Sequence, residues 1–247
     1  MNQKTLGIII KRTNFSEADR ILTIFTERFG KIKAIAKGVR KTTSKLGGYL
    51  EPFILVDFEL HEGKTFYTVT GASVAQNFPT LHTDLNKIAK AFYIGEMIDR
   101  FLEEHQKNPT SFQILIEVLE SIEESREDLI LRIFELKLIE SAGFSPELRN
   151  CVHCREKLTI DRNFWDNIEG GVICENCQQK FKHGQPISDN AIKALRVIEG
   201  ESFDLAKKFK PDIKIRQELD TVLTGYVESI LEREIKSKRF LTQTHEN

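Results

Sequence analysis

The feature that most constrains this chain is a set of four cysteines arranged as two close pairs. Cys151 and Cys154 are separated by two residues, and Cys174 and Cys177 have the same spacing. Two intervening residues let both thiolates of a pair reach one ion from a tight turn, and a loop of roughly 15–20 residues brings the second pair round to complete a tetrahedron. The spacing therefore predicts a single zinc ion held by all four cysteines.

Four sulfur ligands close the coordination shell, so the predicted ion stabilises the fold and does no chemistry. The loop between the pairs carries few apolar residues, and a segment of this kind folds poorly without its metal. Two other interpretations stay open. His153 or His183 could replace a cysteine as ligand, and the cysteines could form a dithiol redox centre, although two facing pairs are less typical of such a centre.

Residues 1–80 show a β-type pattern. Short stretches rich in Ile and Phe alternate with turn-forming residues, and they predict strands at about 6–11, 20–26, 31–36, 52–59 and 65–74. Gly30 can supply the positive φ angle for a hairpin turn between the second and third strands. Five short strands in this length suit a closed barrel of the OB type, although spacing alone does not separate it from an SH3-like barrel.

Residues 81–147 and 186–247 show helical periodicity instead. Apolar side chains recur every three to four positions, for example at Ile88, Phe92 and Phe101 in one stripe and at Leu219 and Leu223 in another. The predicted fold class is therefore α+β with several domains. An OB-fold nucleic-acid-binding domain occupies 1–80, a helical domain occupies 81–147 and 186–247, and the zinc-binding module of 148–185 is inserted into it.

Charge is distributed unevenly along the chain, although the net charge is only −1. Residues 1–50 carry a balance of +8 and residues 51–150 a balance of −9. The stretch 37–45 carries four basic residues and no acidic one, together with a glycine and several hydroxyl side chains, as expected of a phosphate-binding loop. The predicted DNA contacts are Lys37, Arg40, Lys41 and Lys45, extended along the third strand by Lys31 and Lys33.

Aromatic residues accompany this basic stretch. Phe15, Phe29, Tyr49 and Phe53 could stack on the bases of a single strand, or they could belong to the barrel core. The uneven charge could likewise be a solvated surface without a partner.

No catalytic constellation is visible, and the chain is predicted not to be an enzyme. Gly63-Lys64-Thr65 ends like a phosphate-binding P-loop, but Phe58 stands where that motif needs its first glycine. The zinc-protease, deaminase and serine-hydrolase signatures are also missing. No apolar run approaches the length of a membrane span or an export signal, so an intracellular protein without membrane contact is expected.

Several of these stretches resemble the RecO family of bacterial recombination mediators. The resemblance rests on Asn14-Phe15-Ser16-Glu17-Ala18-Asp19-Arg20, on Leu22-Thr23-Ile24-Phe25-Thr26-Glu27, on Ala36-Lys37-Gly38-Val39-Arg40-Lys41 with Leu50-Glu51-Pro52-Phe53, and on Ala142-Gly143-Phe144-Ser145-Pro146 before Cys151-Val152-His153-Cys154. It spans most of the chain and is weakest after residue 185.

The resemblance implies a cytoplasmic, nucleoid-associated protein of DNA repair and recombination after DNA damage, without nucleotide hydrolysis. Proteins of this family bind single- and double-stranded DNA and anneal complementary strands. They work with RecR, and in some cases RecF, to load RecA onto DNA coated by single-strand-binding protein. A DNA-contact role carries over to Lys37, Arg40 and Lys41, which match the family's basic motif.

Two rival functions fit parts of the same pattern. An OB barrel with a zinc module also occurs in RNA-binding proteins of transcription or translation, and a preference for RNA over DNA would favour that class. Bacterial DNA ligases combine the same two elements, but a ligase needs a lysine in a K-x-D-G motif, and no lysine of this chain has that context.

Overall fold

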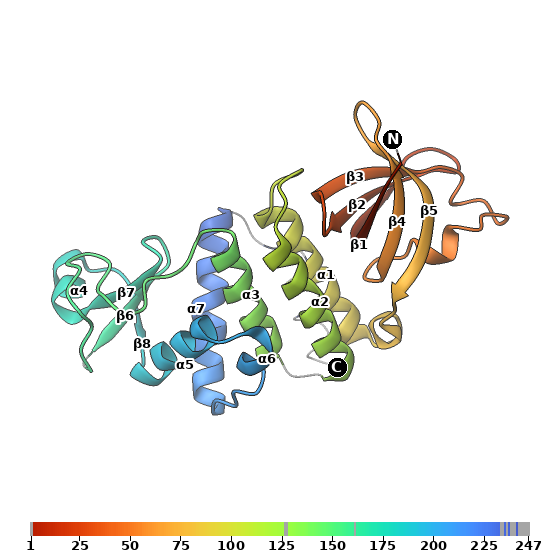
Figure 1. Cartoon of the computed structure of the whole chain (residues 1–247). Coiled ribbons are helices and arrows are strands. Elements are labelled where there is room, and N and C mark those ends of the chain that lie inside the picture. Colours follow the sequence, from red (N-terminus) through yellow and green to blue (C-terminus); the bar gives the residue numbers. More distant parts are fainter. Residues whose placement is uncertain are drawn as a thin grey trace. The chain divides into compact units, whose positions relative to one another are not determined.

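The computed structural model describes residues 2–125, 128–160 and 162–232, together with Ile235, Ser237 and Leu241 (Figure 1). The chain forms two compact units, the first comprising residues 1–126 with 235–247 and the second residues 127–234. The first unit contains the N-terminal strands together with the first two helices. The domain boundaries expected from the sequence remain a prediction.

The first unit contains a closed five-stranded barrel (Figure 1). Its strands are β1 (Asn2–Asn14), β2 (Arg20–Thr26), β3 (Gly30–Ala36), β4 (Leu55–His61) and β5 (Tyr67–Gln76), in the spatial order β1-β2-β3-β5-β4. Strand β1 pairs antiparallel with both β2 and β4, and β3 pairs parallel with β5. The prediction of five strands in an OB barrel is thereby confirmed, and the parallel β3–β5 pairing distinguishes the barrel from an antiparallel SH3-like one.

Alternation along the strands explains the barrel core. In β3 the side chains of Ile32, Ala34 and Ala36 are fully buried in the barrel interior. Phe58 and Leu60 of β4 are buried there as well. Because successive strand residues point to opposite faces, the side chains between them face outward.

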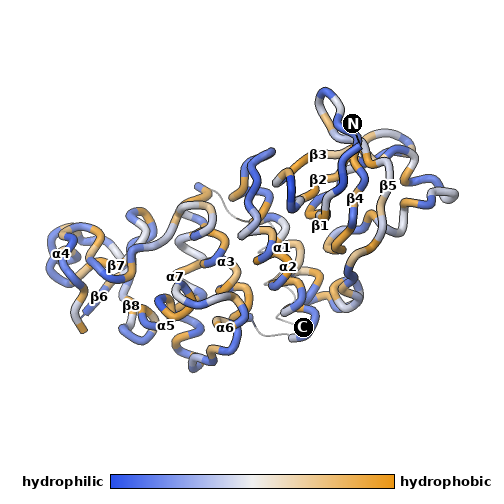
Figure 2. The backbone as a smooth tube through the Cα atoms, viewed as in Figure 1, coloured by the Kyte–Doolittle hydropathy of each residue, from blue (hydrophilic) through white to orange (hydrophobic). Residues whose placement is uncertain are grey.

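Two helices follow the barrel in the first unit. Figure 2 shows that apolar residues recur along each of them. After a 3-10 turn, η2 (Pro79–His82), helix α1 (Leu85–Phe101) begins at Asp84, whose side chain accepts the amides of Asn86 and Lys87. Helix α2 (Pro109–Glu124) begins at Asn108, whose side chain caps Ser111. Phe92, placed by its spacing on the inward face of α1, is 45 % exposed, so this assignment was wrong. Phe92 packs edge-on against Phe53 on the outside of the barrel instead.

The segment between α1 and α2 lies along the outer edge of β3. The His105 amide donates to the Lys31 carbonyl at 2.9 Å, and Glu104 forms a parallel bridge with Lys31. Gly30 has a φ of +67°, as predicted for the β2–β3 turn, and its α-carbon lies directly against the backbone of Gln106. This contact fixes the helical connection against the barrel.

The described residues of the second unit form five helices and a small sheet. Helices α3 (Leu129–Ser141), α5 (Asp189–Gly200), α6 (Phe203–Ala206) and α7 (Ile213–Leu231) pack together through α3. Strands β6 (Asn163–Asp166), β7 (Gly171–Cys174) and β8 (Gln185–Ile187) form a sheet in the order β7-β6-β8. Helix α4 (Glu175–Phe181) follows β7 directly.

Among the described residues, none of the helices combines the length and the apolar character that crossing a bilayer requires.

The contact at Gly30 gives a test of the fold. In Gly30→Ala the new Cβ would lie 2.0 Å from the Gln106 carbonyl oxygen, in a backbone conformation that disfavours side chains. We expect the free energy of unfolding to fall by about 3 kcal/mol, measured by urea denaturation. Gly48→Ala is the matched control, because nothing lies within 4 Å of a Cβ there, and it should change stability by less than about 0.5 kcal/mol. Equal stabilities for the two variants would contradict the packing of residues 104–106 on β3.

Candidate metal centre and nucleic-acid interface

The first cysteine pair lies on a tight turn of the second unit. The Cys151 amide donates to the Glu156 carbonyl at 2.8 Å, and the Arg155 amide donates to the Cys151 carbonyl at 2.9 Å. Arg155 has a φ of 64°, a left-handed conformation that turns the chain back directly after Cys154. The local backbone therefore curls around the two thiols.

The second pair lies where a strand changes into a helix. Cys174 is the last residue of β7 and the residue that precedes the first turn of α4, and Cys177 lies in that turn. Residues three apart in a helical turn share a face, so both thiols of this pair point the same way.

All four cysteine sulfurs meet in one cluster, in which every Sγ lies within 4.8 Å of the others. Cys154 Sγ and Cys174 Sγ are 3.8 Å apart, and the Cys174 amide donates to Cys151 Sγ at 3.4 Å. Cys151 and Cys177 are buried, whereas Cys154 is exposed. Four soft ligands at this spacing could hold one metal ion.

The local electrostatics require a cation if all four thiols are to ionise. Burial by itself raises the pKa of Cys151, but the amides of Cys174, Cys154 and His153 outweigh it and lower that pKa to about 7. Burial and then the neighbouring thiols raise the pKa of Cys177 to about 12. Without a cation one thiolate suppresses the ionisation of the others, so the cluster fits a divalent ion better than four free thiols.

Neither histidine near the cysteines joins the sulfur cluster. His153 and His183 gather instead around Asp166, in a separate group whose ligand atoms also lie within 4.8 Å of one another. Nothing in the sequence singled out Asp166, because an acidic residue before a turn is common and its partners are thirteen and seventeen positions away.

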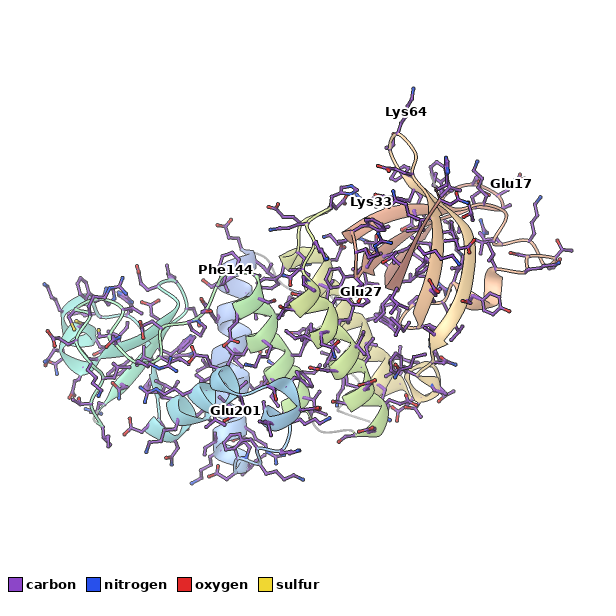
Figure 3. The ribbon with its side chains drawn as sticks, in the orientation of Figure 1. Glu17, Glu27, Lys33, Lys64, Phe144 and Glu201 are labelled. Atoms are coloured by element: carbon purple, nitrogen blue, oxygen red, sulfur yellow. The ribbon has the colours of Figure 1, made fainter. Side chains whose placement is uncertain are left out.

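The four-cysteine module contacts helix α7 through a tryptophan. Trp165 on β6 is buried and meets Tyr226 of α7 edge-on, with ring centroids 5.6 Å apart. The Tyr226 hydroxyl donates to the Phe144 carbonyl at 2.9 Å. Figure 3 labels Phe144 at the end of α3, so this bond ties the module's base to two helices of the unit.

In the first unit the predicted basic stretch, residues 37–45, forms a loop that is anchored at its base. We call it the basic loop. Val39 within it and Leu50 beyond it are both buried in the barrel core. The Gly38 amide donates to Asp19 Oδ1 at 2.7 Å, and Gly38 has a φ of +65°. Lys37, Arg40, Lys41 and Lys45 are all exposed.

The basic loop and the β1–β2 connection form one rim of the barrel. The Arg40 amide donates to the Ala18 carbonyl at 3.0 Å, and Arg40 Nη1 donates to the Ser16 carbonyl at 2.9 Å. The Phe15 amide and the Asp19 carbonyl close the β1–β2 connection at 3.1 Å. Residues 15–19 and 37–45 are therefore held together by hydrogen bonds, and we call them the barrel rim.

Ion pairing divides the eleven basic residues of 1–50 into two groups. Six of them have a carboxylate within 4.0 Å, namely Lys4, Lys11, Arg12, Arg20, Lys31 and Lys33. Among the described residues no carboxylate lies that close to the other five, of which Lys37, Arg40, Lys41 and Lys45 belong to the basic loop. Four of the five basic residues without a carboxylate partner among the described residues therefore lie on the barrel rim.

Lys31 and Lys33, predicted as an extension of the basic surface, lie in a different setting. Lys31 is only 6 % exposed, and its ammonium group donates to the carbonyl and to Oδ1 of Asp99 on α1. Lys33, labelled in Figure 3, is half-exposed and pairs with Glu104 at 2.5 Å. The alternation of side chains along the strand was predicted correctly. Alternation does not show, however, that helix α1 and the α1–α2 connection cover these two lysines.

The four aromatic residues fall into two classes. Phe53 is buried, and Phe29 is partly buried and stacks on Tyr67. Phe15 on the barrel rim is 56 % exposed, and Tyr49 in the 3-10 turn η1 (Gly47–Tyr49), just beyond the basic loop, is 43 % exposed. The barrel-core interpretation holds for Phe29, Phe53 is buried outside that core against Phe92, and Phe15 and Tyr49 remain available to a ligand.

Comparison with known proteins gives a consistent result. The family description "Recombination protein O N terminal" matches residues 1–78, and "Recombination protein O C terminal" matches residues 82–239. The chain is 39 % identical to the DNA repair protein RecO of Dehalococcoides mccartyi strain BAV1 over 95 % of this chain and 92 % of that protein. It is 31 % identical to the DNA repair protein RecO of Thermoanaerobacter sp. strain X514 over 96 % of both chains, and 32 % identical to that of Bacillus pumilus over 97 % of this chain and 93 % of the relative.

The buried Lys31–Asp99 pair predicts a dependence of stability on pH. Burial by itself raises the pKa of Asp99, but the charges of Lys31 and Lys11 outweigh it, so the folded-state pKa lies below the usual value. Such a group stabilises the fold above its unfolded pKa of about 3.9, and the contribution is lost as pH falls through the folded pKa. Asp99→Asn should therefore lower the free energy of unfolding by about 3 kcal/mol at pH 7, since it leaves the Lys31 ammonium buried without a counter-charge.

The measurement is urea denaturation of both proteins between pH 7 and pH 3. The difference in free energy of unfolding between wild type and Asp99→Asn should become smaller below about pH 4. Glu104→Gln, which removes the more exposed pair with Lys33, is the control and should cost less than about 1 kcal/mol. A gap that stays constant with pH would show that Asp99 acts through packing and not through charge.

Proposed function

Because the chain belongs to the RecO family of recombination proteins, we propose that it is a DNA repair and recombination mediator that binds single- and double-stranded DNA. The observation that carries the proposal is the separation of charge on the barrel. Six basic residues of the first fifty are paired with carboxylates, whereas Lys37, Arg40, Lys41 and Lys45 are exposed on the barrel rim without such a partner among the described residues.

The proposed contacts are to phosphates and not to base edges. The basic loop is neither a helix nor a strand that could enter a groove, and its charges spread over nine residues of irregular backbone. Arg40 uses one guanidinium nitrogen to bind Ser16 and keeps its remaining donors for a phosphate oxygen. Lys33 lies outside this core set, and Lys31 is left out because its ammonium group is buried against Asp99.

We further propose that Phe15 and Tyr49 stack on bases of a single strand. Both are exposed aromatics beside the basic loop, and stacking on a flat ring needs no particular base sequence. A cationic loop with two aromatic platforms would hold a strand by its backbone and stack loosely on its bases, without reading its sequence.

Strand annealing follows from the same electrostatics. Neutralising phosphates lowers the repulsion between two complementary strands and so favours their pairing. Loading of RecA onto DNA coated by single-strand-binding protein, with RecR and in some cases RecF as partners, and a cytoplasmic location are carried over from the family and add to the proposal. The P-loop-like lysine Lys64 stands at the tip of the β4–β5 connection (Figure 3), away from any helix start, in line with a role without nucleotide hydrolysis.

The direct test of this function is annealing of complementary oligonucleotides coated with single-strand-binding protein, in the absence of ATP. The protein should accelerate annealing. Faster annealing of RNA than of DNA of the same sequence would favour the RNA-binding class instead, and no acceleration of either would overturn the proposal.

We also propose that Cys151, Cys154, Cys174 and Cys177 hold one structural zinc ion. The four sulfurs within 4.8 Å of one another and the opposed pKa shifts of Cys151 and Cys177 support a divalent cation among them. The ion would fix the turn at 151–154 to the β7–α4 junction, and with four sulfur ligands it would leave no position for a substrate.

The phosphate contacts make a first prediction. Lys41→Ala and Lys45→Ala should weaken binding of unrelated single-stranded oligonucleotides about equally. Each should also reduce the slope of log affinity against log salt by about 0.7. Fluorescence anisotropy across a salt series measures both quantities. Lys193→Ala, an exposed lysine on α5, is the matched control and should leave the slope unchanged. A loss confined to one sequence would instead assign these lysines to base recognition.

The zinc ion makes a second prediction. Cys151→Ser or Cys174→Ser should remove the ion from the sulfur cluster and lower the melting temperature by at least roughly 5 °C. Ile168→Ser, which changes an exposed residue of the same module, is the control and should keep metal content and melting temperature. Metal analysis and calorimetry provide the measurements, and a cysteine variant that melts with wild type would refute a structural role.

A further inference from the structure

A second group of potential metal ligands lies beside the sulfur cluster and takes no part in it. His153 stands between the two cysteines of the first pair, Asp166 ends β6, and His183 lies between α4 and β8. One ligand atom from each of the three lies within 4.8 Å of the others. Three segments that are separate along the chain thus bring an imidazole, a carboxylate and a second imidazole to one point.

Asp166 is the centre of this group and is only 4 % exposed. Its Oδ1 accepts the amides of Ile168 at 2.8 Å and Glu169 at 3.2 Å, which fixes the carboxylate to the β6–β7 turn. Its Oδ2 faces the two rings and has no hydrogen-bond partner among the described residues. A buried carboxylate oxygen left in this state is costly unless a cation or a donor meets it.

The two histidines approach that oxygen without satisfying it. His183 Nδ1 lies 2.6 Å and His153 Nε2 lies 4.0 Å from Asp166 Oδ2, yet neither contact has the alignment of a hydrogen bond, and within the described chain His153 Nε2 is itself unpartnered. A ring nitrogen that lies close to an oxygen but does not point at it has its lone pair directed elsewhere. Ligands of a shared ion have this arrangement, because each points at the ion and not at its neighbour.

The backbone around His183 is fixed in an unusual form. Lys182 has a φ of 58° and Gly184 a φ of 96°, so left-handed residues flank the histidine on both sides. A side chain at position 184 would come within 3.3 Å of Ile173, Phe164 and the Trp165 carbonyl, so glycine is needed there. The tight double turn holds the His183 ring over Asp166, and strained backbone of this kind is characteristic of functional sites.

We propose that His153 Nε2, Asp166 Oδ2 and His183 Nδ1 form a second site for a zinc-class divalent ion, with water as its fourth ligand. Ligand atoms about 2.0–2.2 Å from a tetrahedral ion are about 3.3 Å from one another. The observed contacts of 2.6 Å and 4.0 Å lie on either side of that value, so small side-chain shifts would complete the site.

The ligand set and the local charge select the kind of ion. Two imidazoles and one carboxylate suit zinc, cobalt or nickel, whereas calcium and magnesium prefer oxygen ligands. One carboxylate leaves an excess of positive charge, and a neighbouring ion bound by four thiolates carries a net charge of −2 that offsets it. The second ion would tie the turn at 151–154 to β6 and to the α4–β8 connection, and so brace the first site.

Metal content of the full-length protein tests this site separately from the DNA-binding role. After saturation with zinc and removal of excess by gel filtration, wild type should retain two ions per chain. Asp166→Asn and His183→Ala should retain one each, and His82→Ala, an exposed histidine of the barrel unit, should retain two.

Cobalt(II) titration of the metal-free wild type provides a readout that needs no variant. The first equivalent should give the intense thiolate-to-cobalt charge-transfer bands of a four-sulfur site, and the second only weak d–d bands of a nitrogen and oxygen site. One ion in wild type, an unchanged second ion in both Asp166→Asn and His183→Ala, or a titration that ends after the first equivalent would overturn the proposal. In those cases the three residues are a structural cluster without metal, and the four-cysteine site and the DNA-binding proposal are unaffected.

Discussion

Four thiols gathered within 4.8 Å cannot all ionise unless a positive charge lies among them, and the second unit is built around that constraint. The turn at 151–154 buries a single apolar side chain besides its cysteines, Val152, in a small cluster with Ile173. The Cys174 amide also donates to Cys151 Sγ, which links the turn to the β7–α4 junction. This small module contacts the helices through Trp165, which meets Tyr226 of α7, and through Asn163, whose side chain donates to Asp189 Oδ1 of α5 at 3.1 Å. A cation at the sulfur cluster would therefore stabilise the β6–β7 hairpin and, through Trp165, the packing of the hairpin on the helix.

In the barrel, six of the eleven basic side chains of residues 1–50 are paired with carboxylates. Arg12 and Arg20 share Glu51, and Lys31 and Lys11 share Asp99, so two carboxylates offset half of these four positive charges. The basic loop is excluded from these pairs because Val39 and Leu50 anchor its base in the core and leave its charged side chains outside. The same hydrophobic burial that closes the barrel thus concentrates the unpaired positive charge on one rim.

The sequence predicted local features well, but it predicted poorly which distant elements pack over a given side chain. The five strands and the turn at Gly30 depend on residues close together in the chain, and all are present. Lys31 was placed on an open surface, because alternation shows which way a side chain points and not what lies over it. Phe92 and Asp166 were missed for the same reason, since their settings are created by partners that no local spacing reveals.

The small number of proposed phosphate contacts fits the proposed annealing role, in which DNA has to be released as well as bound. Four contacts on a single strand correspond to a salt slope of about 2.8, so a fourfold rise in salt weakens binding roughly fifty-fold. An annealing protein that bound each strand through ten phosphate contacts would release it slowly, and the strand would be less available to its complement and to later partners. A short cationic rim with exposed aromatics instead supports fast, sequence-independent exchange. Under the proposed function, the excess of acidic residues across 51–150 would limit DNA contacts to the rim.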